Sequence, residues 1–112
     1  MYHALGLTLV RQKRHQEGIE ALRRAHELDP DSARYAYVFG VALSSAGDRG
    51  EAVRVLAGAH QRRPGDREIL VALATISRDA GQRERAIAYA EKLVRLSPGD
   101  PDARRLLAEL RR

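Results

Sequence analysis

A hydrophobic stripe of helical period marks the middle third of the chain. Small and apolar residues recur there at the i, i+3, i+4, i+7 spacing of one helix face; they are Ala36, Phe39, Gly40 and Leu43. Ser32 stands just before the stripe and is suited to cap a helix N-terminus. Gly47 follows the stripe and suits the left-handed position at which many helices end. The pattern therefore predicts one helix between Ser32 and Gly47.

A second helix is predicted directly after this turn, from about Arg49 to about Arg62. Its buried face is expected to consist of Ala52, Val53, Leu56 and Ala59. Two helices joined by so short a turn pack side by side, and small residues at the crossing let their axes approach. We expect Gly40 to lie against Ala52 at this crossing.

The helix-turn-helix pattern recurs with a fixed period of 34 residues, which is the spacing of Pro30, Pro64 and Pro98. Shifting the chain by this period also aligns a column of small residues, namely Gly6, Gly40, Ala74 and Ala108. A period of this length is typical of repeat proteins, and the apolar content consists mainly of Ala, Leu and Val, of which Ala and Leu are the best helix formers. The sequence therefore predicts an all-α repeat protein.

The columns resemble the tetratricopeptide repeat. The Leu-Gly pair of the family's first helix stands here as Leu5-Gly6 and Phe39-Gly40, and then as Leu73-Ala74. The resemblance covers the whole chain and implies a right-handed α-solenoid that forms a single domain, residues 1–112. Three helix-turn-helix units are expected at about 1–32, 33–66 and 67–100, followed by a capping helix at 101–112.

Two positions depart from the family pattern. Lys13 stands where the later turns have glycine, so a looser first turn is expected. Arg62 stands where the other units have Leu28 and Leu96, so we expect the array to loosen there.

The two ends of the array are expected to differ. Met1 falls two residues inside the first helix of the first unit, with no helix before it to cover its apolar face. We therefore expect a C-terminal piece of a longer protein, or a homo-oligomer that pairs through this open N-terminal face. Asp100 and Pro101 begin the last helix as N-cap and first helical residue, and the helix runs to about Leu110. It resembles the solvating terminal helix of such arrays.

The resemblance also implies a groove lined by the first helices, which in this family usually binds an extended or helical peptide. The groove residues implied by the family register are Leu7, Arg11, Arg34, Tyr37, Val41, Ser44, Val71, Thr75 and Arg78. Tyr37 is the best single candidate for contact, because a phenol offers area and a polar tip at small entropic cost. The alternative is that these residues only complete the packing between neighbouring first helices.

The function expected from the resemblance is a protein-interaction scaffold that binds a peptide or protein segment. A structural or self-associating spacer within a larger protein is the alternative. Some family members hold the C-terminal carboxylate of chaperones with a set of Lys and Asn residues. That set is missing, since the chain has no Asn and the matching places include His3, Leu7 and Val38.

The net charge of +5 raises RNA binding as a third candidate, with basic clusters such as Arg62-Arg63. Acidic residues are interleaved at helical spacing, however, as Glu20 is with Arg23 and Arg24, and no aromatic residues alternate with the basic ones for base stacking. Nucleic acid is therefore disfavoured as a partner. The Arg-rich, Asn-free composition is typical of a GC-rich bacterial genome.

No residue pattern indicates catalysis, a cofactor or a metal. The serines lack a Gly-x-Ser-x-Gly context, and no Gly-rich phosphate loop precedes a helix. The histidines, which are His3, His15, His26 and His60, lack the spacing of paired metal ligands and are interpreted as solvated. The chain has no cysteine and no stretch near the roughly 20 apolar residues of a membrane span. We expect a soluble non-enzyme, in the cytoplasm or the periplasm.

Overall fold

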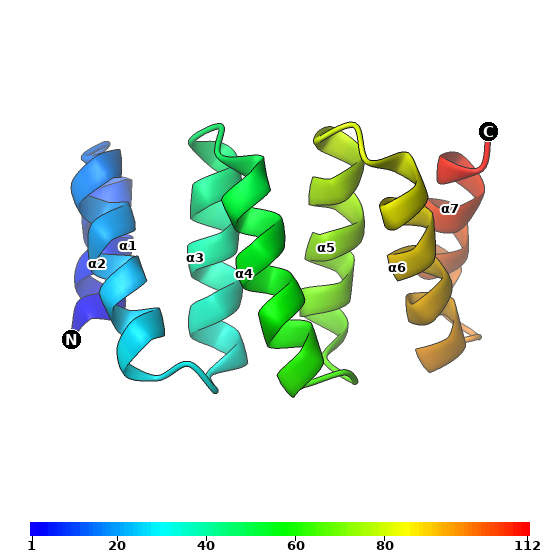
Figure 1. The fold of residues 1–112 in the computed structure, drawn as a ribbon, viewed down its shortest axis with the longest axis horizontal. Helices are drawn as coiled ribbons and strands as arrows, with labels where there is room; N and C mark the ends of the chain where they lie inside the picture. Colours follow the sequence, from blue (N-terminus) through cyan, green and yellow to red (C-terminus); the bar gives the residue numbers. More distant parts are fainter.

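The computed structural model describes all residues, 1–112, and consists of seven α-helices. They are α1 (Tyr2–Arg11), α2 (His15–Leu28), α3 (Ala33–Ser45), α4 (Arg49–Arg62), α5 (Arg67–Asp79), α6 (Arg83–Leu96) and α7 (Pro101–Leu110). The helices follow one another in a row, with the two termini at opposite ends (Figure 1). The predicted all-α class, with three helix-turn-helix units and an additional terminal helix, is confirmed.

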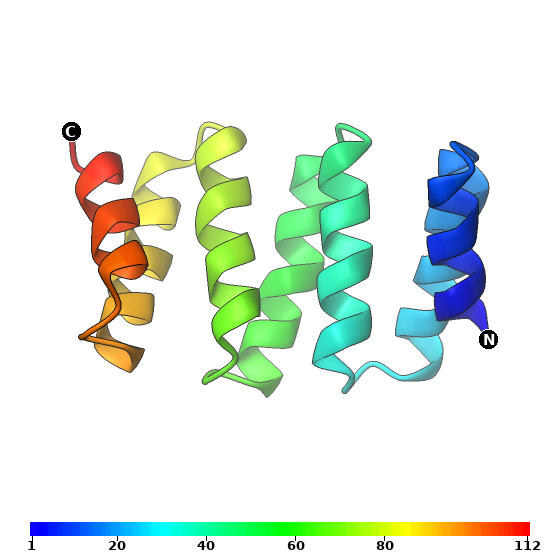
Figure 2. The ribbon, with the colours of Figure 1, turned by 180° about the vertical axis from the view of Figure 1, so that it is seen from behind.

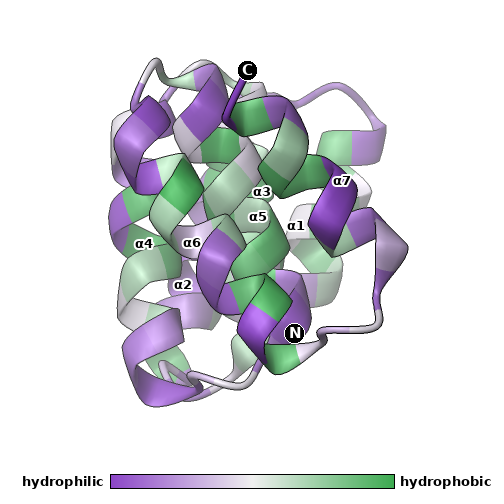
Figure 3. Cartoon of the chain, turned by 90° about the vertical axis from the view of Figure 1, so that its right-hand side faces the viewer, coloured by the Kyte–Doolittle hydropathy of each residue, from purple (hydrophilic) through white to green (hydrophobic).

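The helices form two layers. The layer nearer the viewer in Figure 1 contains α2, α4 and α6, whereas α1, α3, α5 and α7 form the layer that faces the viewer from behind in Figure 2. Along the long axis, hydrophobic positions gather between the layers and hydrophilic ones lie mostly outside (Figure 3). We call the surface formed by α1, α3 and α5 the first-helix face.

Local side-chain chemistry sets the start of four helices. The side chains of Ser32, Asp48, Asp66 and Asp100 each accept a hydrogen bond from a backbone N–H in the first turn of the following helix. These bonds satisfy donors that have no partner inside the helix. The longest helices have 14 residues, and none has both the length and the apolar character that a bilayer crossing requires.

The first turn has the same geometry as the two later turns, although it contains Lys13. The backbone φ angle is +64° at Lys13, +92° at Gly47 and +78° at Gly81, so all three residues are left-handed. The N–H of Arg14 donates to the carbonyl of Leu9 at 2.9 Å, and equivalent bonds close the other two turns. The prediction of a looser first turn is wrong. The turn keeps its hydrogen bonds, and Lys13 bears the strain of a conformation that favours glycine.

Arg62 links the first unit to the second. Its guanidinium donates to the carbonyl oxygen of Pro30 at 2.6 Å and lies 3.8 Å from the carboxylate of Asp31. Leu28 and Leu96, at the matching positions, are 72% and 48% exposed, so no unit uses this position for its core. The prediction that the array loosens at Arg62 is therefore wrong, because the long side chain bridges two loops.

Glycine allows close packing within each helix pair, but opposite a different residue from the one predicted. A Cβ atom at Gly40 would lie 2.7 Å from Cγ of Leu56, and one at Gly6 would lie 2.6 Å from Cγ of Leu22. Gly40 therefore packs against Leu56, whereas Ala52 is buried elsewhere in the same cluster. Leu22 and Leu56 occupy the same column, so the two units share this contact.

The largest hydrophobic cluster is centred on the second unit. Its 12 buried residues include Phe39 from α3, Leu56 from α4 and Leu73 from α5. At the C-terminal end, Leu107 and Leu110 of α7 are buried against small residues of α5 and α6. The terminal helix thus covers the apolar side of the third unit.

Candidate binding cleft

An apolar cleft opens between the first and second units. It has a volume of about 370 Å³ and is bordered by α1, α2 and α3. Its lining consists of Leu7, Val10, His15, Ile19, Leu22, Tyr37, Val38, Val41, Ala42 and Ser45. Leu7 and Val41 are each 36% exposed, so two large apolar side chains of the lining remain in contact with solvent. The cleft is the most apolar open feature of this face.

The cleft follows from the small size of Ala42. The matching positions one and two units later hold Ile76 and Leu110, and both are buried. Ile76 belongs to the cluster at the second junction, where α3 and α5 pack directly against each other. α1 and α3 do not pack so closely, and the methyl group of Ala42 leaves the space between them open. One column of side chains thus distinguishes an open first junction from a closed second one.

Three of the nine predicted groove residues meet in this cleft. Leu7 comes from α1, and Tyr37 and Val41 come from α3, where they lie one helical turn apart. Sequence reasoning missed the contribution of α2, whose His15 and Ile19 form part of the lining. The helical spacing of these two residues, four apart and facing α3, was the available signal.

The other six predicted residues lie outside the cleft lining. Arg11 is exposed, Ser44 is half-buried, and Val71 packs against the cluster of Leu70, Leu93 and Ala103. The remaining three make contacts within the chain. Thr75 donates its hydroxyl hydrogen to the Val71 carbonyl at 2.9 Å, Arg78 pairs with Asp79 at 3.1 Å, and Arg34 pairs with Glu68 at 3.9 Å. For Val71 and Thr75 these contacts agree with the packing alternative.

The two first helices that border the cleft carry basic residues and no acidic ones. α1 contains Arg11 and α3 contains Arg34, and neither helix contains Asp or Glu. Lys13 follows in the turn after α1. The guanidinium of Arg34 lies 5.9 Å from the ring centroid of Tyr37, within the range of a cation–π contact. The surroundings of this apolar cleft are therefore positively charged.

Three histidines pack against aromatic rings at the unit junctions. The ring centroids are 4.5 Å apart for His3 and Tyr35, 5.7 Å for His26 and Phe39, and 6.1 Å for His60 and Tyr89. The interpretation of all four histidines as solvated is wrong for these three, whose Nδ1 atoms are buried without a hydrogen-bond partner. The spacing of His26 and His60 by one repeat period was the signal for a shared packing position.

Burial lowers the pKa of each of these three imidazoles below the ordinary value of 6.5. A nearby cation lowers the pKa further in each case, and these cations are Arg34 for His3, Arg62 for His26 and Lys92 for His60. The imidazoles thus act as neutral packing groups at neutral pH. No set of three metal-binding side chains gathers in the chain.

Solved structures similar to this one include the crystal structure of MamA, with 23% identity and a TM-score of 0.84, covering 97% of this chain and 64% of that one. The chain therefore spans slightly less than two thirds of MamA. The first TPR of Spaghetti (RPAP3), bound to the HSP90 peptide SRMEEVD, has 14% identity and a TM-score of 0.84 over 98% of this chain and 87% of that one. The second TPR domain of human RPAP3, in complex with the HSP70 peptide SGPTIEEVD, has 17% identity and a TM-score of 0.84 over 99% and 92%. At these identities the likeness concerns the fold.

No curated protein matches the sequence. Tetratricopeptide repeat models match residues 1–32 and residues 43–110, which together are most of the chain. Both the repeat columns and the paired helices agree with these matches. The chain therefore belongs to the tetratricopeptide repeat family.

Proposed function

We propose that this chain is a protein-interaction scaffold that binds a peptide or protein segment along its first-helix face. The observation that carries the proposal is the apolar cleft, where Leu7, Tyr37 and Val41 meet at a surface that solvent reaches. A segment that covers these side chains removes apolar area from water, which contributes roughly 25 cal/mol per Å². The peptides held by the two RPAP3 domains of the same fold support the proposal, as does a domain type that is typically non-catalytic.

The proposed path of the segment runs from the cleft across α3 toward α5. Tyr37 is its central contact, because its ring lines the cleft and also lies beneath the guanidinium of Arg34. Arg11 lies one helical turn beyond Leu7 on the same face of α1 and can contact a segment that leaves the cleft. Val71 and Arg78 would extend the contact onto α5.

A peptide-display selection tests this proposal without a known partner. Random twelve-residue peptides are selected on the wild-type chain, and the enriched peptides are then measured on the double variant Tyr37→Ser, Val71→Ser. The matched control is Leu28→Ser, Leu96→Ser, which removes two exposed apolar side chains that do not line the cleft. We expect binding to be lost only in the first variant, with circular dichroism showing that both are folded. Peptides that bind both variants equally would refute the proposal.

Self-association through the N-terminal end is the second candidate, and the exposure of Leu5 favours it. Leu5 is 45% exposed, whereas Phe39 and Leu73 in the same column are fully buried because a preceding helix pair covers them. Light scattering at high concentration tests this candidate with wild type and Leu5→Ser. A dimer that Leu5→Ser dissociates would support it, and a monomeric wild type would exclude it.

RNA binding is the weakest candidate, because several arginines are already engaged. Arg23 pairs with Glu51, and Arg62 and Arg63 donate to carbonyl oxygens of the loop at Pro30 and Asp31. A fluorescence titration with unstructured RNA at moderate salt tests it. Binding that persists at this salt concentration would revive RNA as a partner.

A further inference from the structure

The inference concerns what the cleft selects, and it therefore rests on the proposed function. The cleft volume of about 370 Å³ lies near the lower end of the range for small-molecule sites, roughly 300–1,000 Å³. Eight of its ten lining residues are hydrophobic. A space of this size and character fits the apolar portion of one large side chain better than it fits a polar segment of backbone, because backbone groups would lose hydrogen bonds there.

Only the first junction offers such a space. Ile76 occupies at the second junction the position that Ala42 occupies at the first, and its side chain is buried in the cluster of α3, α4 and α5. The first-helix face therefore has one deep apolar site. A partner segment would need one large apolar residue, and not a series of them at the spacing of the repeats.

The charge around this site has one sign. Neither α1 nor α3 contains an acidic residue, whereas Arg11, Lys13 and Arg34 surround the cleft on these helices and the turn between α1 and α2. Two acidic residues lie nearby on α2, but the carboxylate of Glu17 is held by Arg14 and that of Glu20 lies 3.5 Å from Arg23. The field at the cleft favours acidic residues on either side of the inserted side chain.

We propose that the cleft between the first and second units binds an acidic peptide segment through one large aliphatic or aromatic side chain, and that Ala42 is the residue that selects it. The selection is by size, since a longer side chain at position 42 would occupy the space that the partner's side chain needs. The basic residues around the cleft add attraction that salt screens, because they are exposed.

The test uses fluorescein-labelled nine-residue peptides in which a central leucine is flanked by Asp and Glu. One matched peptide has alanine at the centre, and another has lysine in place of every acidic residue. Fluorescence anisotropy measures their binding to wild type, to Ala42→Ile and to Ala42→Val. Ala88→Ile is the control, because it adds the same carbon atoms to an exposed position on α6. Thermal unfolding of each variant shows that it is folded.

The wild type is expected to bind the leucine peptide at least about tenfold more tightly than the alanine peptide, since burial of a leucine side chain is favourable by more than this factor requires. Ala42→Ile is expected to abolish that preference, Ala42→Val to reduce it, and Ala88→Ile to preserve it. The lysine peptide is expected not to bind.

Equal binding of the leucine peptide by wild type and Ala42→Ile would overturn the inference, and so would equal binding of the acidic and lysine peptides. If no peptide of this set binds, while the display selection yields peptides that require Tyr37, the inference fails and the proposed function stands. If the display selection also fails, both fail. If Ala42→Ile changes only self-association in light scattering, the occupant is a second copy and the inference of an acidic peptide is wrong.

Discussion

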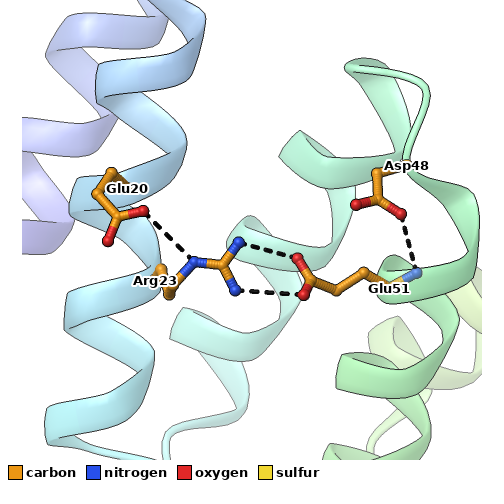
Figure 4. A network of polar contacts seen from close by, with 4 residues as sticks. All are labelled: Glu20, Arg23, Asp48 and Glu51. Carbon is orange, nitrogen blue, oxygen red and sulfur yellow. Dashed lines mark hydrogen bonds and ion pairs between the residues drawn. The ribbon is translucent and has the colours of Figure 1, made fainter.

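Arg23 and Glu51 form a two-pronged ion pair that joins the first unit to the second. Nη2 of Arg23 lies 2.9 Å from Oε1 of Glu51, and Nη1 lies 3.2 Å from Oε2 (Figure 4). The same guanidinium lies 5.1 Å from the ring centroid of Phe39, and its Nε is 3.5 Å from the carboxylate of Glu20. Asp48, the N-cap of α4, accepts a hydrogen bond from the N–H of Glu51. The pair therefore connects α2 and α4 directly above a core residue of α3.

Loss of this pair should destabilise the array more than loss of an ordinary surface pair. Arg23→Ala is expected to lower the free energy of unfolding by about 1–2 kcal/mol, since it removes two charge-assisted hydrogen bonds and the cover over Phe39. Arg14→Ala is the control, because Arg14 pairs with Glu17 on the exposed surface within one helix turn and should cost less than about 0.5 kcal/mol. Urea unfolding of both variants measures the difference, and equal costs would contradict the inter-unit role.

Gly40 should not tolerate even the smallest side chain. Gly40→Ala places a Cβ 2.7 Å from Cγ of the fully buried Leu56, and overpacking of this kind costs about 1–3 kcal/mol, offset in part by the helix propensity of Ala, about 1 kcal/mol. A net loss is therefore expected. Gly58→Ala in α4 is the matched control, since a Cβ there meets nothing within 4 Å, and this change should raise stability. Thermal unfolding compares the two, and a stabilised Gly40→Ala would show that Leu56 can move aside.

Lys13 and Gly47 occupy equivalent turn positions and should respond in opposite directions to an exchange. Lys13→Gly removes the strain of a left-handed non-glycine residue, about 1–2 kcal/mol, and this gain is reduced by the greater freedom of glycine in the unfolded chain. Lys13→Gly is expected to raise the unfolding free energy slightly, and Gly47→Lys to lower it. Chemical denaturation of both variants checks the signs. Destabilisation by Lys13→Gly would mean that the Lys13 side chain contributes a contact of its own.

Acidification should weaken the unit junctions through three histidines. The pKa values of His3, His26 and His60 are lowered in the folded chain, so the unfolded chain binds protons more readily below the ordinary value of 6.5. Their contribution to stability is therefore complete above this pH and decreases as the pH falls through the folded-state values. The groups that face them act mainly in this direction. Arg34 and the N-terminal amino group face His3, Arg62 faces His26 and Lys92 faces His60, and only Glu27 opposes the shift at His26.

Unfolding measured at pH 7.5 and at pH 5.5 checks this expectation. The triple variant with glutamine at positions 3, 26 and 60 should show a smaller loss of stability between the two pH values than wild type. His15→Gln changes an exposed imidazole on α2 and should leave the pH dependence in place. At still lower pH a further loss is expected from Glu51, because its hydrogen bond from Arg23 holds its carboxyl pKa below the ordinary value of 4.5. Identical pH dependence in wild type and the triple variant would show that the histidine contacts do not matter for stability.

The sequence by itself determined the helices, the turns and the family. Each of these depends on residues close together in the chain: the apolar spacing around Phe39, the caps at Ser32 and Asp66, and the glycine at position 47. The period of 34 residues then extends one unit to the whole chain. Local patterns of this kind survive in one dimension, which is why the all-α class and the three units with a terminal helix could be predicted.

The tertiary structure alone decided which features of the face are open. The cleft depends on the difference in side-chain size between Ala42 and Ile76 and on how closely neighbouring first helices approach, and the family register treats these two positions as equivalent. The burial of His26 and the link from Arg62 to Pro30 likewise depend on contacts across units. A repeat period records what the units share. The physical reason for the cleft is a difference between them, and packing in three dimensions is what turns that difference into an open space.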